Sequence, residues 1–190
     1  MPESICKYES RPTNHEPREY CGLFGISGHR QASWLTYLGL FAQQHRGQEA
    51  CGIAVNNKGV LNLHKDMGLV NDVFNEKILS TLKGDMALGH VRYSTTGSSI
   101  LKNSQPLLID YAKGSICGAH NGNLVNSLEA RQGLERSGSI FQTTTDSEII
   151  IHLMAKARSK DLKESLLYAL KRIRGAYSLL MMDNSCLIGV

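Results

Sequence analysis

Apolar residues in the first half of the chain follow two spacings, one typical of helices and one typical of strands. Trp34, Leu38 and Phe41 recur at intervals of three and four residues, which predicts one face of a helix that ends at Gly47. Two short apolar runs flank Asn57-Lys58-Gly59, and a glycine in so short a connection is typical of a β-hairpin turn. In chain order we expect a strand at 21–26, a helix at 31–46, hairpin strands at 53–56 and 60–64, a helical stretch at 73–82 and a strand at 86–93.

The second half begins with strands and continues with helices. Thr145-Asp146-Ser147-Glu148 has the residue types of a capping box, which predicts a helix N-terminus at this point. The apolar run at 186–190 has the pattern of a strand that the end of the chain cuts off, so we expect a fragment of a longer protein. In chain order we expect strands at 107–111 and 115–120, helices at 124–134, from 145 and at 162–173, and hairpin strands at 176–182 and 186–190.

Composition divides the chain into a leader and a globular domain. Three of the four prolines and seven charged residues fall within residues 1–20, which have no apolar run to form a core or a signal peptide. The chain as a whole is 42% hydrophobic and 20% charged, as soluble globular proteins are. We therefore expect a leader at 1–20 and one α+β domain at 21–190. Its two groups of strands would form sheets covered by helices, in an order that spacing alone does not fix.

Charge and cysteine usage argue against several classes of protein. The net charge of +4 is spread along the chain without the basic run of a nucleic-acid-binding arm, so we expect no nucleic-acid partner. No stretch approaches the roughly 18 apolar residues of a membrane-spanning helix, so we expect no membrane partner. The five cysteines are widely spaced and include no C-x-x-C pair, which argues against a zinc site and for a reducing, cytoplasmic location.

Cys21 is the first candidate for chemistry because it opens the globular region directly after the leader. If the leader were removed, the thiol would lie beside its own α-amine, whose ordinary pKa of about 8 suits a general base. One residue would then supply both nucleophile and base. The alternative is a buried cysteine that packs as a small apolar side chain at the start of a strand.

Polar residues gather where predicted strands and helices end, and each has a structural explanation of its own. Arg46 would interact favourably with a helix C-terminus, and Arg92 would be a surface charge. Asn121-Gly122 has the sequence of a type I′ turn, and Asp146 that of a helix cap. Taken singly, none of these residues indicates a function.

Taken together in this order, the segments CGLFGI, QHRGQEACGI, GHVRYSTTGSS, NSQPL, HNGNLVNS and TTTDSEII resemble the N-terminal glutaminase domain of the amidophosphoribosyltransferases. The resemblance covers residues 21–190. It implies an N-terminal nucleophile hydrolase fold, a four-layer αββα sandwich of two mainly antiparallel sheets, here incomplete at the C-terminus. The related glutaminase domain of glucosamine-6-phosphate synthase would be expected to show EYRGYDSAG and HTRWATHG, which this sequence lacks.

The resemblance implies a role for each matching position. Cys21 matches the nucleophile, Arg92 the arginine that binds the glutamine α-carboxylate, and Asp146 the carboxylate that binds the α-ammonium. The Asn121 side chain and the Gly122 N–H match the oxyanion hole. A guanidinium and a carboxylate placed in this way would select a free amino acid by both of its backbone charges.

Arg46 and Tyr93 match motif positions near the nucleophile, and we expect them to support it. The resemblance further implies that ammonia from glutamine passes to phosphoribosyl pyrophosphate on a phosphoribosyltransferase domain that is missing from this chain. That transfer is the first committed step of purine synthesis, catalysed by a pentosyltransferase (glycosyltransferase), and the fragment alone would be at most a glutaminase. No metal or cofactor is expected in this chain. Mg²⁺, a 4Fe-4S cluster and homo-oligomeric assembly are implied for the full-length enzyme.

Two alternatives remain at this point. In the first, the chain is the glutaminase half of a sugar-phosphate aminotransferase. In the second, it is a non-catalytic domain of the same fold in which Cys21 stays joined to its leader.

Overall fold

The computed structural model describes residues 21–93 and 99–190, so the predicted leader and part of the GHVRYSTTGSS segment lie outside the described residues. The strands are β1 (Gly22–Ser27), β2 (Ala50–Asn57), β3 (Val60–Met67), β4 (Met86–Arg92), β5 (Leu107–Tyr111), β6 (Gly114–Leu124), β7 (Gly175–Met182) and β8 (Leu187–Gly189). The helices are α1 (Ala32–Ala42), α2 (Val70–Val73), α3 (Glu76–Thr81), α4 (Ser127–Arg136), α5 (Ser147–Lys156) and α6 (Leu162–Leu170), with short 3-10 helices η1 (Gln44–Arg46) and η2 (Leu101–Asn103).

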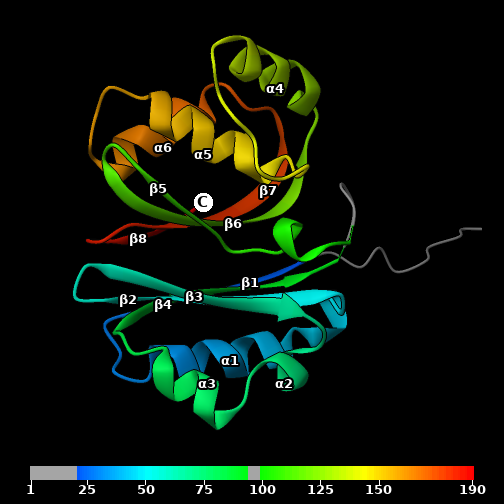
Figure 1. The fold of residues 1–190 in the computed structure, drawn as a ribbon, viewed down its shortest axis with the longest axis vertical. Coiled ribbons are helices and arrows are strands. Elements are labelled where there is room, and N and C mark those ends of the chain that lie inside the picture. Colours follow the sequence, from blue (N-terminus) through cyan, green and yellow to red (C-terminus); the bar gives the residue numbers. More distant parts are fainter. Residues whose placement is uncertain (1–20, 94–98) are drawn as a thin grey trace, which may run out of the picture.

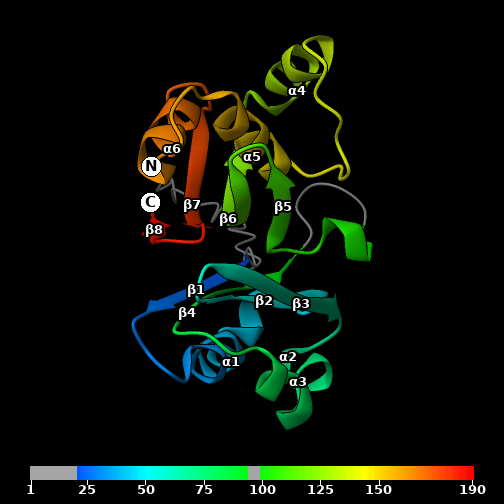
Figure 2. The same ribbon diagram turned by 60° about the vertical axis from the view of Figure 1, so that its left-hand side comes forward.

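The strands form two four-stranded sheets, in the orders β1-β4-β2-β3 and β5-β6-β7-β8, and every strand pair is antiparallel. Figure 1 shows the two sheets stacked face to face, with α1, α2 and α3 outside the first and α4, α5 and α6 outside the second. The rotated view keeps this order of layers (Figure 2). The α+β class and the four-layer αββα sandwich are therefore confirmed.

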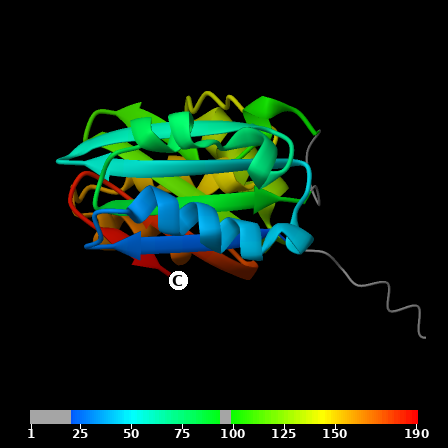
Figure 3. The same cartoon turned by 90° about the horizontal axis from the view of Figure 1, so that it is seen from below.

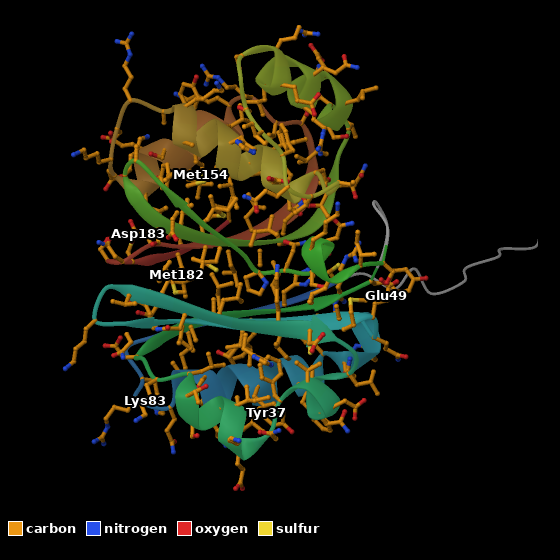
Figure 4. The ribbon with its side chains drawn as sticks, viewed as in Figure 1. Tyr37, Glu49, Lys83, Met154, Met182 and Asp183 are labelled. Carbon is orange, nitrogen blue, oxygen red and sulfur yellow. The ribbon has the colours of Figure 1, made fainter. Side chains whose placement is uncertain are left out.

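Three apolar clusters fill the three spaces between the layers. One lies between α1–α3 and the first sheet, one between the two sheets, and one between the second sheet and its helices. In Figure 4, Met182 points into the space between the sheets and Met154 lies on the helix side of the second sheet. Both methionines are almost fully buried.

The predicted hairpins are present; the strands of the first are longer than their apolar runs indicated, whereas the last strand, β8, is shorter. The β2–β3 turn is formed by Lys58 and Gly59 with φ values of 52° and 91°, the left-handed conformation that a type I′ turn requires. The predicted helical stretch at 73–82 is instead divided into α2 and α3. Asn75 interrupts it, because its side chain caps α3 by accepting a hydrogen bond from the Ile78 N–H at 3.0 Å.

The predicted apolar face of the first helix is wrong. Trp34, Leu38 and Phe41 are 38%, 46% and 51% exposed, and the buried residues of α1 are instead Ala32, Ser33, Thr36 and Leu40. Figure 3 shows α1 lying along the first sheet. The contact is so close that an added Cβ at Gly89 would lie 2.6 Å from the Thr36 methyl group. Thr36 and Leu40 therefore face the sheet at Gly89, while Trp34, Leu38 and Phe41 lie on the more exposed side of the helix.

Two boundaries around residue 124 also differ from the prediction. The strand expected to end at His120 continues as β6 to Leu124, and the helix expected from Leu124 begins at Ser127. Val125 and Leu128, two of its apolar residues, are 73% and 69% exposed.

Within the described residues, no helix has both the length and the apolar character needed to cross a bilayer.

Candidate functional site

A narrow pocket at one end of the sandwich brings together residues from both sheets and from α5. Its lining includes five of the predicted site residues, namely Cys21, Arg92, Tyr93, Gly122 and Asp146, and also Gln105, His120, Thr145 and Ser147. The cavity measures about 20 Å³, enough for about one water molecule. Glu49, whose carboxylate lies 3.9 Å from Arg92 Nη1, marks this end in Figure 4, and Asp183 marks the opposite end.

Cys21 immediately precedes β1, and the main chain of Tyr93 holds its thiol at the end of β4. Sγ accepts a hydrogen bond from the Tyr93 N–H at 3.3 Å and donates one to the Tyr93 carbonyl at 3.4 Å. Burial raises the pKa of the Cys21 thiol, and the Tyr93 N–H and the Arg92 charge lower it by less. The thiol is thus neutral at physiological pH and needs a base before it can act as a nucleophile. Tyr93 supports Cys21 through its backbone, while its side chain is 39% exposed.

Arg46 contacts the main chain of Cys21 and is not part of the pocket lining. Its Nε donates a hydrogen bond to the Cys21 carbonyl at 3.2 Å from the short helix η1. Gly47 follows, and an added Cβ there would lie 2.7 Å from the backbone of Arg92. A residue larger than glycine would push η1 away from β4, so Gly47 allows Arg46 to reach Cys21.

Arg92 is the last residue of β4 and is only 3% exposed, so the alternative explanation of Arg92 as a surface charge is wrong. It is paired with Ala50 of β2 in the centre of the first sheet. Its guanidinium lies 3.9 Å from the Glu49 carboxylate, which is itself partly exposed. A buried arginine at a pocket wall presents an oriented positive charge with several N–H donors.

Asn121 and Gly122 lie within β6, paired with Ser178 and Tyr177 of β7, so the alternative explanation of this pair as a type I′ turn is wrong. Gly122 has φ of +148°, and an added Cβ would lie 2.2 Å from the Ala176 carbonyl oxygen. Only glycine fits this position without displacing the neighbouring strand.

The alternation of side chains along β6 places Asn121 and Gly122 on different faces. Cys117 and Ala119 belong to the cluster between the sheets, and Asn121 continues that face. Gly122 lies on the opposite face, toward α5, and lines the pocket. Asn121 is not part of the pocket lining.

Asp146 immediately precedes α5, but its side chain does not cap that helix. Its Oδ2 instead accepts a hydrogen bond from the Leu124 N–H at 3.0 Å, and its Oδ1 lies 3.6 Å from His120 Nδ1. Burial raises the pKa of Asp146, but the contacts with His120 and Leu124 lower it more, so the carboxylate stays ionised. The prediction of a helix here is confirmed, whereas the capping role of Asp146 is wrong.

Glu148, the other acidic residue of the predicted capping box, fixes the loop that carries Asp146. Its carboxylate accepts hydrogen bonds from the Gln142 N–H at 2.8 Å and the Thr143 N–H and hydroxyl at 2.7 Å, and lies 3.4 Å from His152 Nε2. Burial raises the pKa of Glu148, but His152 and these donors lower it to about 2. A buried, permanently ionised glutamate therefore holds the loop before α5 in one conformation.

The sequence motifs contained four further pocket residues to which no role was assigned: Gln105, His120, Thr145 and Ser147. Gln105 precedes β5, and its side chain forms hydrogen bonds with the main chain of His120. These bonds continue the pairing along β6 past the first residue of β5. Its position just before a strand, inside NSQPL, was the available signal. Within residues 21–93 and 99–190, no group of three His, Cys, Asp or Glu is placed so that it could hold a metal ion.

Comparison with known proteins gives consistent matches. The glutamine amidotransferase domain family matches residues 90–188. "Amidophosphoribosyltransferase 2, chloroplastic" of Arabidopsis thaliana is 44% identical over 190 residues, all of this chain and 34% of the relative. The amidophosphoribosyltransferase of Bacillus subtilis (strain 168) is 45% identical over 171 residues, 90% of this chain and 36% of the relative.

A solved structure agrees with the sequence matches. The glutamine phosphoribosylpyrophosphate amidotransferase from B. subtilis, complexed with ADP and GMP, aligns with a TM-score of 0.83 and 43% identity over 88% of this chain and 36% of that one. The chain therefore spans about a third of the length of these relatives.

Proposed function

Because the chain belongs to the glutamine amidotransferase domain family, we propose that its pocket hydrolyses glutamine to glutamate and ammonia with Cys21 as the nucleophile. One observation carries the proposal: Cys21, Arg92 and Asp146, far apart in the sequence, line the same small pocket. A thiol, a buried cation and a buried anion together match the amide and the two backbone charges of a free amino acid.

The proposed reaction begins with removal of the leader, which frees the α-amino group of Cys21. This amine takes the thiol proton, and Sγ forms a bond to the amide carbon of glutamine. The carbonyl oxygen becomes an oxyanion that the Asn121 amide and the Gly122 N–H stabilise. The C–N bond then breaks as the nitrogen takes the proton from the Cys21 ammonium, and ammonia leaves. Water hydrolyses the remaining γ-glutamyl thioester, which releases glutamate and restores the thiol.

Substrate recognition assigns one backbone charge to each side of the pocket. The Arg92 guanidinium binds the α-carboxylate, and the ionised Asp146 binds the α-ammonium. Arg46 and Tyr93 keep Cys21 in place through its carbonyl and its thiol. A cavity of about 20 Å³ is smaller than glutamine, so binding requires pocket side chains to move apart.

Labelling with a glutamine analogue that carries a diazoketone tests this function on protein that begins at Cys21. The analogue should alkylate Cys21 selectively, because only this thiol shares a pocket with Arg92 and Asp146. Burial raises the pKa of Cys51 and Cys117 to about 12, which makes them poor nucleophiles. Peptide mapping by mass spectrometry reads the site, and excess glutamine should protect it. A label on another cysteine, or no release of glutamate from glutamine, would refute the proposal.

Substitution of the two charged pocket residues tests substrate recognition. Arg92→Lys and Asp146→Asn should each raise the KM for glutamine about 10- to 100-fold, since each weakens a charge-assisted hydrogen bond to the substrate. Steady-state release of glutamate gives KM and kcat. Arg174→Lys is the matched control, because Arg174 forms an exposed ion pair with Glu129 at 3.4 Å. An unchanged KM in both pocket variants would remove these residues from the binding site.

The names of the relatives extend the proposal to a longer protein. In it, ammonia made at Cys21 passes to phosphoribosyl pyrophosphate on a phosphoribosyltransferase domain, the first step of purine synthesis. The same names favour phosphoribosyl pyrophosphate over the acceptor of a sugar-phosphate aminotransferase. Cytoplasmic location and homo-oligomeric assembly belong to the proposal as well. The four described cysteines are all unpaired, as is usual in a reducing compartment.

A further inference from the structure

We infer that His120 is a positioning residue, whose ring holds the Asp146 carboxylate in the orientation that receives the substrate α-ammonium. The inference rests on the proposed function, in which Asp146 binds that ammonium. His120 lines the pocket together with Asp146 and Ser147, and it is 4% exposed.

The backbone of His120 is fixed on the edge of β6 that faces β5, where β5 does not reach as far as His120. β5 begins at Leu107, which is paired with Gly118, so His120 lies beyond the end of β5. The Gln105 side chain replaces the missing strand. Its Oε1 accepts from the His120 N–H at 2.7 Å, and its Nε2 donates to the His120 carbonyl at 3.3 Å. The main-chain position from which the His120 side chain extends is therefore fixed.

The ring itself is oriented by three neighbours. Nδ1 lies 3.1 Å from Ser147 Oγ and 3.6 Å from Asp146 Oδ1, and Tyr177 packs edge-on with its ring centroid 6.3 Å away. Nε2 is buried and has no hydrogen-bond partner among the described residues. A proton on Nδ1 would be shared with a hydroxyl and an anion, whereas a proton on Nε2 would have no acceptor. This assigns the proton of the neutral ring to Nδ1.

Asp146 depends on this proton because its other contacts within the described part of the chain are with main-chain N–H groups, that of Leu124 on Oδ2 and its own. Leu124 and His120 both belong to β6, so one strand holds both carboxylate oxygens. Each oxygen keeps a further lone pair for the substrate. Without His120 the carboxylate would retain only these main-chain contacts, and Oδ1 would lose the neighbour that orients it toward the pocket.

Substitutions that keep or remove an N–H near Nδ1 test the inference on the chain that begins at Cys21. The amide nitrogen of His120→Asn falls close to the position of Nδ1, that of His120→Gln falls close to Nε2, and His120→Leu has no donor. His120→Leu and His120→Gln should raise the KM for glutamine about 10- to 100-fold, with a smaller change in kcat. His120→Asn should stay within a few-fold of the parent.

A substrate without the α-ammonium separates positioning from general damage. Glutaramate is glutamine without its α-amino group, so it has nothing for Asp146 to bind. The ratio of kcat/KM for glutamine to kcat/KM for glutaramate should fall about 10-fold or more in His120→Leu and His120→Gln, and should be preserved in His120→Asn. Should His120→Leu fail to fold, His120→Gln carries the same comparison.

Two results would overturn the inference and leave the proposed function intact: an equal loss on both substrates, or a fall in the ratio for His120→Asn as large as that for His120→Gln. Failure of the parent chain to hydrolyse glutamine would instead overturn the proposed function, and this inference with it.

Discussion

A chain that begins at Cys21 should hydrolyse glutamine about 10²- to 10⁴-fold faster than one that keeps residues 1–20, the range over which a general base contributes to catalysis. In the longer chain the nitrogen of Cys21 is part of a peptide bond and cannot accept a proton. The thiol, whose pKa burial raises, then has no α-amine to deprotonate it. Intact mass spectrometry identifies the two forms, and release of glutamate measures their rates.

The comparison needs a control for the effect of the leader on access to the pocket. In an engineered chain with one added glycine directly before Cys21, the Cys21 nitrogen is part of a peptide bond, but the bulk of the leader is absent. This variant should be as slow as the chain that keeps residues 1–20. If either blocked form turns over glutamine as fast as the chain that begins at Cys21, the α-amine is not the base, and the domain needs no processing.

Replacement of Asn121 by alanine should lower kcat about 10²- to 10³-fold, the usual effect of removing one oxyanion donor. Because the proposed bond from Asn121 to the substrate oxygen strengthens in the transition state, and Asn121 binds neither backbone charge of glutamine, the glutamine KM should change little. The diazoketone analogue should also label Cys21 more slowly. Asn62→Ala is a suitable control, since Asn62 is an exposed strand asparagine that bonds the Val60 carbonyl. An unchanged kcat in Asn121→Ala would assign the oxyanion hole to other groups.

The sequence predicted the identity and order of most elements, because strand runs and hairpin turns are local signals. It did not predict which face of α1 is buried. Apolar spacing identifies the side with most large residues, yet Gly89 lets this helix approach closely through Thr36 and Leu40, so the buried side is a different one. Burial of a helix face depends on how near its partner comes, and that distance is set by residues elsewhere in the chain.

The candidate site shows the same division between local and distant information. Asn121-Gly122 and the residues around Asp146 have ordinary turn and capping chemistry when considered alone. Pairing with β7 makes the first a strand, and the Leu124 N–H draws the Asp146 carboxylate away from its own helix. Local propensity was overridden in both cases by partners more than 20 residues away, a separation at which spacing rules carry no information.

The division of the pocket between two sheets bears on how the protein acquires activity as it folds. Cys21 and Arg92 come from the first sheet, Gly122 from the second and Asp146 from the loop before α5, so neither sheet contains a partial site that could act alone. Contacts between segments so distant in the chain close large loops, and such contacts form slowly during folding. Glutaminase activity should therefore return only in the last phase of refolding, after helical structure has recovered. A reactive thiol would in this way remain inactive until the sandwich around it is complete.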